Sequence, residues 1–204
     1  MAALLVDGAA ADMATAPAGG RIRVWDPVVR LFHWSMVGGF ALNMFLVEDG
    51  EAAHRWIGYA VLAAIAVRLV WGFVGTPHAR YGDFLPTPTG LYSYLRDLAR
   101  GRERRFVGHN PAGAVMMVLL IGLMLACGVS GWMLGLDRYW GSEWLEELHG
   151  ALAYAILGMA GLHVLAAIIE SVRHGENLIW SMITGFKRAP RPEDVDHAAA
   201  ARRG

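Results

Sequence analysis

The stretch 148–169, LHGALAYAILGMAGLHVLAAII, decides the fold, because it is apolar and contains no Asp, Glu, Lys or Arg. Its length is close to the roughly 20 residues that a helix needs to cross a bilayer. His149 and His163 lie fourteen residues apart in this run, which in a helix is about 21 Å of rise and about 40° of rotation. Both therefore share one helix face near opposite membrane surfaces. Because an ionisable side chain in lipid is costly unless it faces a bundle interior, this pattern predicts buried sites at two depths.

Three further apolar stretches are also near the roughly 20 residues that a span needs. Leu31–Val47 and Pro111–Leu136 contain no Asp, Glu, Lys or Arg, and Trp56–Val74 contains only Arg68. Hydrophobic residues make up 55% of the 204-residue chain, and no strand pattern competes with the apolar blocks. The sequence therefore predicts an all-α fold, namely an integral membrane four-helix bundle with four spans.

The net charge of zero hides an alternation of basic and acidic connections. Fifteen Lys and Arg residues lie in 1–30, 75–109 and 170–204, whereas the connections 48–55 and 137–147 contain one Arg each and are acidic. The positive-inside rule then predicts that the N and C termini and the 75–109 connection are cytoplasmic. The two acidic connections are expected on the outer side.

An amphipathic stretch lies within the 75–109 connection. Gly90–Arg100 places four apolar residues on one face of a helix, namely Leu91, Tyr94, Leu95 and Leu98. We expect this stretch to lie along the cytoplasmic surface of the membrane.

The two ends of the chain differ in composition from the part between them. Residues 1–20 are rich in Ala and Gly and contain no basic residue, so they lack the positive region of a secretory signal. We expect a disordered cytoplasmic tail at 1–20 and a second, solvated and disordered tail at 189–204. One transmembrane domain, 21–188, lies between these tails.

A single cysteine, Cys127, lies inside the third apolar stretch. One cysteine excludes an intrachain disulfide, an iron–sulfur cluster and a C-x-x-C-H site for covalent haem. We interpret Cys127 as a small packing residue.

Four histidines fall at two matching depths in the predicted topology. His33 is near the inner end of the first span, His54 is near the outer end of the second, and His149 and His163 are outer and inner on the fourth. The pairs His33–His163 and His54–His149 each join two helices at one depth, as bis-histidine ligation of haem requires. They predict two non-covalent haems whose irons are roughly 20 Å apart. A zinc site usually has three or four protein ligands, but each level offers only two histidines. A proton relay usually includes Asp or Glu, and the apolar stretches contain neither. Both are therefore weaker interpretations of the histidine pairs than haem. A lone membrane histidine can also be an interhelical hydrogen-bonding residue.

Arg68 lies fourteen residues after His54 and shares its helix face at the inner level. Its guanidinium is expected to pair with a haem propionate, the alternative being that it reaches the inner headgroups. Several glycines lie close to the histidines, namely Gly38, Gly39, Gly58 and Gly150. They would either leave room for a porphyrin or allow close helix packing, and we give these two interpretations equal weight.

The chain resembles the bacterial cytochrome b561 family and, more closely, the b-type cytochrome subunits of nickel–iron hydrogenases. The resemblance spans 22–188 and rests on short motifs: Val24–Pro27, Arg30–Trp34, His54–Gly58, Arg68–Trp71, Gly108–Pro111 with Gly113, Leu148–Gly150, Gly161–His163, and Glu176–Asn177 with Met182–Gly185 and Lys187–Arg188. It implies a four-helix protein of the bacterial inner membrane with two haems b. The ligands it implies fall on His33, His54, His149 and His163, on the first, second and fourth helices.

The resemblance also implies electron transfer between membrane quinone and a redox partner. The outer partner would be a hydrogenase subunit or a c-type cytochrome, steered by the acidic connections. The resemblance does not place the quinone; we expect it to react at the inner level, where Arg68 could hold negative charge and His109 could carry a proton. His109 precedes a helix start and has an ordinary pKa that suits proton uptake, the alternative being a helix-capping role.

Two other functions are kept open. The chain could be a self-contained quinone reductase that oxidises superoxide or a small reductant, or a membrane anchor with structural haems, so its status as an enzyme is left open. No residue is assigned a catalytic role, and no nucleic-acid partner is expected. Gly131-x-x-x-Gly135 is too common a motif to decide whether the chain is a homodimer.

Overall fold

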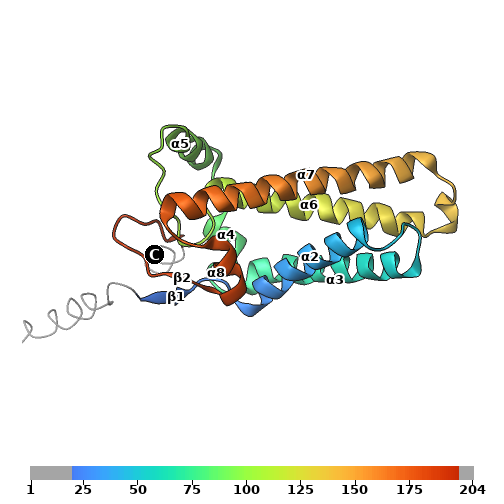
Figure 1. Ribbon diagram of the computed structural model, residues 1–204, viewed down its shortest axis with the longest axis horizontal. Coiled ribbons are helices and arrows are strands. Elements are labelled where there is room, and N and C mark those ends of the chain that lie inside the picture. The colour runs from blue at the N-terminus through green and yellow to red at the C-terminus, as the bar shows by residue number, and fades with distance from the viewer. Residues whose placement is uncertain (1–19, 198–204) are drawn as a thin grey trace, which may run out of the picture.

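The computed structural model describes residues 20–197, and four long helices dominate it. They run alongside one another (Figure 1), with α2 packed on α3, α3 on α6 and α6 on α7. Their bounds are α2 Pro27–Phe45, α3 Ala52–Val74, α6 Pro111–Leu134 and α7 Glu143–His174.

Short elements surround the two ends of these helices. One end carries β1 Arg21–Arg23, α4 Tyr81–Phe84, α5 Pro88–Ala99, α8 Leu178–Thr184 and β2 Phe186–Arg188. The opposite end carries the turn between α2 and α3 and the short 3₁₀ helix η1 Asp137–Tyr139. We call the end with the two strands the inner end and the other the outer end.

Three helices among the described residues are long and apolar enough to cross a membrane: α3, α6 and α7. The expected first span corresponds to α2, which has 19 residues but is not among these three. Arg30, His33 and Asn43 lie within α2, and such polar residues lower the hydropathy of a helix. Length and composition thus make three helices suitable for crossing a membrane, and a fourth span stays a prediction.

Side-chain caps fix the starts of two long helices, α2 and α6. Asp26 Oδ1 accepts a hydrogen bond from the amide of Val29 at 2.9 Å, and Pro27 follows it at the first helical position of α2. Asn110 plays the same role for α6, accepting from the amide of Gly113 at 2.6 Å. Such caps satisfy amides that would otherwise lack a partner, and proline at this position has a preset φ.

Asp26 also links α2 to the end of α3. Its Oδ2 accepts hydrogen bonds from Trp71 Nε1 at 3.0 Å and from Thr76 Oγ1 at 2.6 Å. Burial alone would raise the pKa of this carboxyl, but the hydrogen bonds from Thr76, Trp71 and the backbone outweigh burial and lower the pKa below its usual value. The first and second long helices are therefore joined at the inner end by one ionised side chain.

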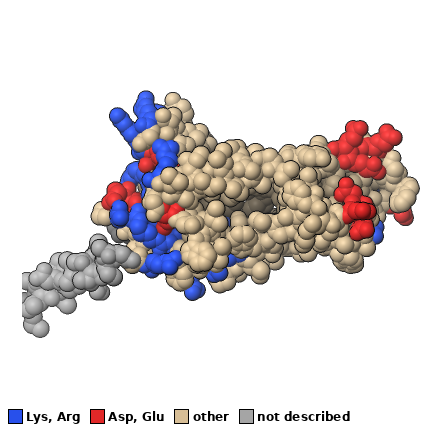
Figure 2. Space-filling view, viewed as in Figure 1, with Lys and Arg blue, Asp and Glu red and all other residues tan. Residues whose placement is uncertain are grey.

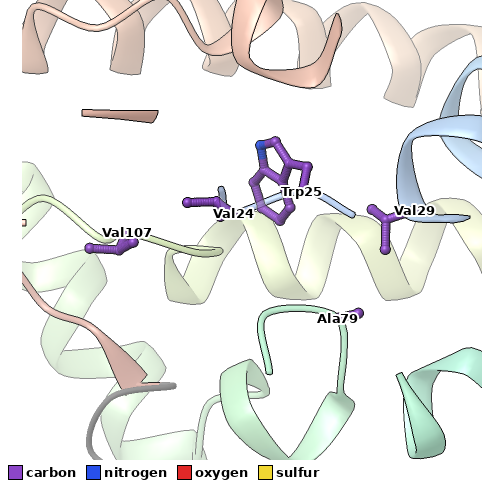
Figure 3. Packing of buried hydrophobic residues seen from close by; sticks show 5 residues of the cluster. All are labelled: Val24, Trp25, Val29, Ala79 and Val107. Carbon is purple, nitrogen blue, oxygen red and sulfur yellow. The ribbon is translucent and has the colours of Figure 1, made fainter. Parts of the chain in front are cut away.

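An apolar cluster fills the inner end. It joins the segment before α2 to the connection between α3 and α6, and Figure 3 shows its members, Val24, Trp25, Val29, Ala79 and Val107. A second cluster lies between α3, α6 and α7 and consists of Val61, Ile65, Met124 and Ile156. The inner end is therefore held by apolar packing as well as by hydrogen bonds.

Both ends of the described chain meet at the inner end. Strands β1 and β2 pair antiparallel, with Arg21 opposite Arg188. Beyond β2, the amide of Val107 donates to the carbonyl of Val195 at 2.9 Å, and the amide of Val195 donates to the carbonyl of Arg105 at 2.8 Å. Residues 189–197 thus differ from the expected solvated tail, because backbone pairing and buried ion pairs hold them.

The ion pairs at this end are centred on Arg105. Its guanidinium donates to Glu176 at 2.9 Å and to Asp194 at 2.7 Å, and all three side chains are nearly fully buried. Lys187 lies beside them and donates to the carbonyl of Val107 at 2.9 Å. Burial lowers the pKa of Lys187 to about 8. The predicted tail at 1–20 lies outside the described residues except for Gly20, as do 198–204.

Basic charge is concentrated at one end of the long axis of the molecule. Figure 2 shows most Lys and Arg at the inner end, mixed there with some Asp and Glu, and mainly Asp and Glu at the outer end, with an uncharged midsection between them. This arrangement is the one on which the predicted orientation depends.

Candidate functional site

The structure brings the four sequence-predicted histidines together as two pairs. The ring centres of His33 and His163 lie 6.5 Å apart, with an interplanar angle of 52°. The ring centres of His54 and His149 lie 6.1 Å apart, with an angle of 61°. Each pair joins α7 to a different helix, α2 at the inner level and α3 at the outer level.

These separations fit an iron ion between two imidazoles. A ligating nitrogen lies about 2 Å from a metal ion and about 1.1 Å from its own ring centre, so two axial rings have centres about 6 Å apart. Direct packing of two neutral rings would not need this spacing at both levels. Figure 2 also shows a hollow in this face of the molecule between its two charged ends. The residues present therefore fit a haem at each level.

His149 is oriented by the neighbouring helix α6. Its Nδ1 lies 3.0 Å from the hydroxyl of Ser130 and 3.0 Å from the carbonyl oxygen of Cys127. An Nδ1–H that donates to the carbonyl leaves Nε2 as the ligating nitrogen, which is how outer partners fix the tautomer of a metal-bound histidine. Sequence reasoning assigned Cys127 only to packing and did not single out Ser130, because neither contact can be found without the α6–α7 register.

His54, the other outer histidine, lies in the first turn of α3. Its backbone carbonyl accepts a hydrogen bond from Asn43 Nδ2 at 3.0 Å, which ties the start of α3 to α2. Its Nδ1 lies 3.6 Å from the exposed carboxylate of Asp49. At this distance the carboxylate is an electrostatic neighbour, too far for a hydrogen bond.

His33, the inner histidine on α2, has a buried Nδ1 with no hydrogen-bond partner among residues 20–197. Its ring meets that of Trp34 edge-on at 5.1 Å. Trp34 in turn donates through Nε1 to the carbonyl of Met182 at 3.3 Å, so α8 supports this part of α2. A buried polar nitrogen without a partner is costly, which is a reason to expect a bound group here.

Arg68 is buried, with 1% of its side chain surface exposed, so it does not reach out to the inner headgroups. Its NH2 group donates to the carbonyl of Ala79 at 3.1 Å, and its guanidinium lies 4.9 Å from the ring centre of Tyr81. Its NH1 group has no hydrogen-bond partner within the described part of the chain. A buried guanidinium with spare donors is suited to bind a carboxylate.

His109 is enclosed by aromatic rings at the inner level. Its ring centre lies 4.8 Å from that of Trp25 and 4.5 Å from that of Phe84. Burial, followed by the positive charges of Arg68 and Lys187, lowers the pKa of His109 to about 3. This differs from the expectation of an ordinary pKa suited to proton uptake: enclosed in this way, the ring is neutral at physiological pH.

The sequence profile described as prokaryotic cytochrome b561 matches residues 24–185, a range that includes all four paired histidines. The chain belongs to the prokaryotic cytochrome b561 family.

Three relatives of this b561-family chain are each named "Probable Ni/Fe-hydrogenase B-type cytochrome subunit". The relative from Rhodobacter capsulatus is 24% identical over 81% of this chain and 81% of its own length. The relative from Rhizobium leguminosarum bv. viciae is 25% identical over 85% of this chain and 91% of its own length. The relative from Cupriavidus necator is 26% identical over 90% of this chain and 95% of its own length. No solved structure matches the chain.

As a member of the cytochrome b561 family, the chain is a membrane protein of the b-type cytochrome class, with haem b as its cofactor and electron transport as its role. The haem itself supplies one-electron transfer when it is bound. What the chain's own residues supply is a set of imidazoles, a buried guanidinium and the space beside them.

The glycines of this cytochrome divide between the two roles that the sequence left open. A Cβ atom added at Gly38, Gly58 or Gly150 would meet nothing within 4 Å, so these positions border open space. A Cβ atom at Gly39 would lie 2.6 Å from Val61, so Gly39 serves the packing of α2 on α3. Gly131 has a third role, because a Cβ atom there would lie 2.9 Å from Cε1 of His149. The small-residue motif that begins at Gly131 thus accommodates a paired histidine.

Proposed function

We propose that this chain is a two-haem cytochrome b that passes electrons across the membrane between quinone and a protein partner on the outer side. The observation that carries the proposal is the pair of ring separations, 6.5 Å at the inner level and 6.1 Å at the outer level. Each haem would be held by one histidine of α7 and one histidine of another helix. Electrons would then cross the bilayer in two stages, through haems whose irons are roughly 20 Å apart, a separation set by the rise along α7.

The proposed orientation has four spans, with both termini and the inner end in the cytoplasm of a bacterial inner membrane. Fifteen basic residues lie in the inner segments and two in the outer connections, and the positive-inside rule assigns the basic side to the cytoplasm. A reporter fused after residue 140 is expected to be active only when exported. Cytoplasmic activity of that fusion would reverse the orientation.

Quinone is proposed to react at the inner level. Arg68 offers an unused NH1 donor and His109 a buried Nδ1, and both atoms lack a hydrogen-bond partner among residues 20–197. A neutral His109 donates or accepts one hydrogen bond at a carbonyl oxygen or a propionate, while Arg68 stabilises negative charge there. Proton uptake at His109 would need an anion beside it to raise its low pKa.

The protein partner is proposed to dock at the outer end, where seven acidic residues surround two arginines: Glu48, Asp49, Glu51, Asp137, Glu143, Glu146 and Glu147. The names of the relatives favour a subunit of a nickel–iron hydrogenase as this partner, with a c-type cytochrome as the alternative. An acidic face steers a basic partner and speeds its association at low ionic strength. Binding should therefore weaken as salt is raised.

The number and position of the haems test the proposal directly. Purified protein is expected to contain two haems b per chain in a pyridine haemochrome assay. His33→Ala and His163→Ala should each remove one and the same component of a redox titration, and His54→Ala and His149→Ala should each remove the other.

His174→Ala is the matched control, because His174 lies on α7 eleven residues beyond His163 and outside both pairs. It should keep both components. One haem per chain, or loss of the same component in the His33 and His54 variants, would contradict the proposal.

A further inference from the structure

Helix α5 presents one of its two apolar faces to the rest of the protein. Tyr94 is buried, its hydroxyl donates to Glu170 at 3.1 Å, and its ring lies 5.6 Å from that of Phe106. Leu91 and Leu98 lie on the same side of the helix, three residues before and four residues after Tyr94, and both are partly buried. These three residues fix how α5 is rotated on the protein.

A second apolar stripe on α5 is exposed. Tyr92 is 72% exposed and Leu95 is 45% exposed, and Ala99, four residues further, is also exposed. Spacings of three and four residues place all three on one side of a helix. The sequence placed Leu95 on one apolar face with Leu91, Tyr94 and Leu98, but in the structure Leu95 points outward while the other three face the protein. No residue of the described chain covers this stripe, so a soluble environment would leave it in contact with water.

The position of α5 matches the level at which a bilayer would end. Figure 1 shows α5 beside the inner ends of α6 and α7, standing out laterally, with its axis crossing the axes of the long helices. A helix that crosses the transmembrane direction at this level lies in the plane of the membrane surface. The exposed stripe would then be in contact with acyl chains.

Basic side chains flank the stripe. Arg96 and Arg100 follow Leu95 and Ala99 by one residue each and are exposed, and Arg102 is exposed just beyond the helix. Arg96 has a neighbouring carboxylate, Asp97, at 3.3 Å. Figure 2 shows blue atoms gathered on the outward side of this protrusion and uncharged surface toward the midsection of the molecule. Apolar atoms toward the bilayer core and guanidinium groups toward the headgroups form the pattern of an interfacial helix.

We propose that α5 is an interfacial helix that buries Tyr92 and Leu95 in the adjacent leaflet and binds the headgroups of acidic phospholipids through Arg96 and Arg100. This inference rests on the membrane-crossing part of the proposed function and is independent of the haem ligands and of quinone. The partner is a lipid because the exposed stripe is narrow, lies at the bilayer boundary and is flanked by positive charge on its outward side.

Depth in the membrane provides the first test. Single cysteines are introduced at Tyr92 and, as the matched control, at Ser93, which is exposed on a different side of the same helix. Both are made in a Cys127→Ala background, labelled with a nitroxide and placed in nanodiscs. The label at 92 is expected to be accessible to oxygen and shielded from a water-soluble nickel chelate, and the label at 93 should show the reverse. A label at 92 that is in water, or that is shielded from both relaxants as in a protein contact, would overturn the proposal.

Lipid selectivity provides the second test. The full chain is reconstituted in nanodiscs with equal phosphatidylglycerol and phosphatidylcholine, and the retained lipids are counted by native mass spectrometry. Arg96→Gln with Arg100→Gln is expected to weaken phosphatidylglycerol binding by about fivefold per arginine, hence roughly 25-fold for the pair. The control, Arg55→Gln with Arg138→Gln, removes the same charge at the outer end and should keep the lipid bound at α5.

Equal losses in the two double variants, or no loss in either, would overturn the proposal. Haem content and the redox titration should be unchanged in both, so a failure here is distinguishable from a failure of the proposed two-haem function.

Discussion

Replacing Gly131 by alanine should weaken the outer haem and leave the inner one intact. The new Cβ atom would lie 2.9 Å from Cε1 of His149, and the contact becomes ordinary only near 3.4 Å. The ring must therefore move away from α6 by about 0.5 Å, a shift that lengthens the contacts of its one Nδ1–H with the Cys127 carbonyl and the Ser130 hydroxyl, each now 3.0 Å. Weakening this shared hydrogen bond costs about 1 kcal/mol, or roughly fivefold in affinity for haem.

Transfer of haem to excess apomyoglobin measures this effect, with redox titration to identify the component that is lost. The wild-type chain should release its two haems with two rate constants, and in Gly131→Ala only the outer haem should leave faster. Gly122→Ala is the matched control, since Gly122 lies on the same helix, faces open space and gains the same helix propensity. Faster loss of the inner haem, equal effects in both variants, or no change in Gly131→Ala would refute the reasoning.

Three other predictions concern the inner end. Burial lowers the pKa of Lys187 to about 8, so between about pH 8 and 10.5 the unfolded state binds more protons than the folded state. Thermal stability should therefore rise with pH in this range, and Lys187→Met should remove this rise. The pKa of about 3 for His109 predicts stability that is present above about pH 6.5 and lost as the pH falls toward 3; His109→Phe should flatten this acid limb in the same melting experiment. Asp194→Asn removes one carboxylate from Arg105, so trypsin should cut the 189–197 segment faster while the haem content stays the same.

The sequence was sufficient to pair the histidines because their positions in the apolar stretches are set by simple helix geometry. His149 and His163 are fixed on one helix face by their spacing, and alternation of loop charge indicates which end of each helix is which. These are one-dimensional properties of the chain. The structure brings together the same two pairs, and their role as haem ligands stays a proposal.

Other features depend on contacts between helices that no spacing reveals. Ser130 and the carbonyl of Cys127 reach His149 only in one register of α6 against α7. His109 has an ordinary sequence context, yet its pKa depends on the rings of Trp25 and Phe84, which lie far away along the chain. The acidic residues near the C-terminus suggested a solvated tail. The sequence does not show that Asp194 has a buried partner, because that partner, Arg105, is 89 residues away along the chain.

The pairing of β1 with β2 has a consequence for how the protein is made. It joins residue 21 to residue 188, so the first strand must wait for almost the whole chain to be synthesised before it finds its neighbour. His33 also meets His163 only after α7 has entered the membrane, whereas the α2–α3 hairpin is complete much earlier. The α2–α3 hairpin can therefore form before the inner end closes, and closure of that end by β1 and β2 is a late step in folding.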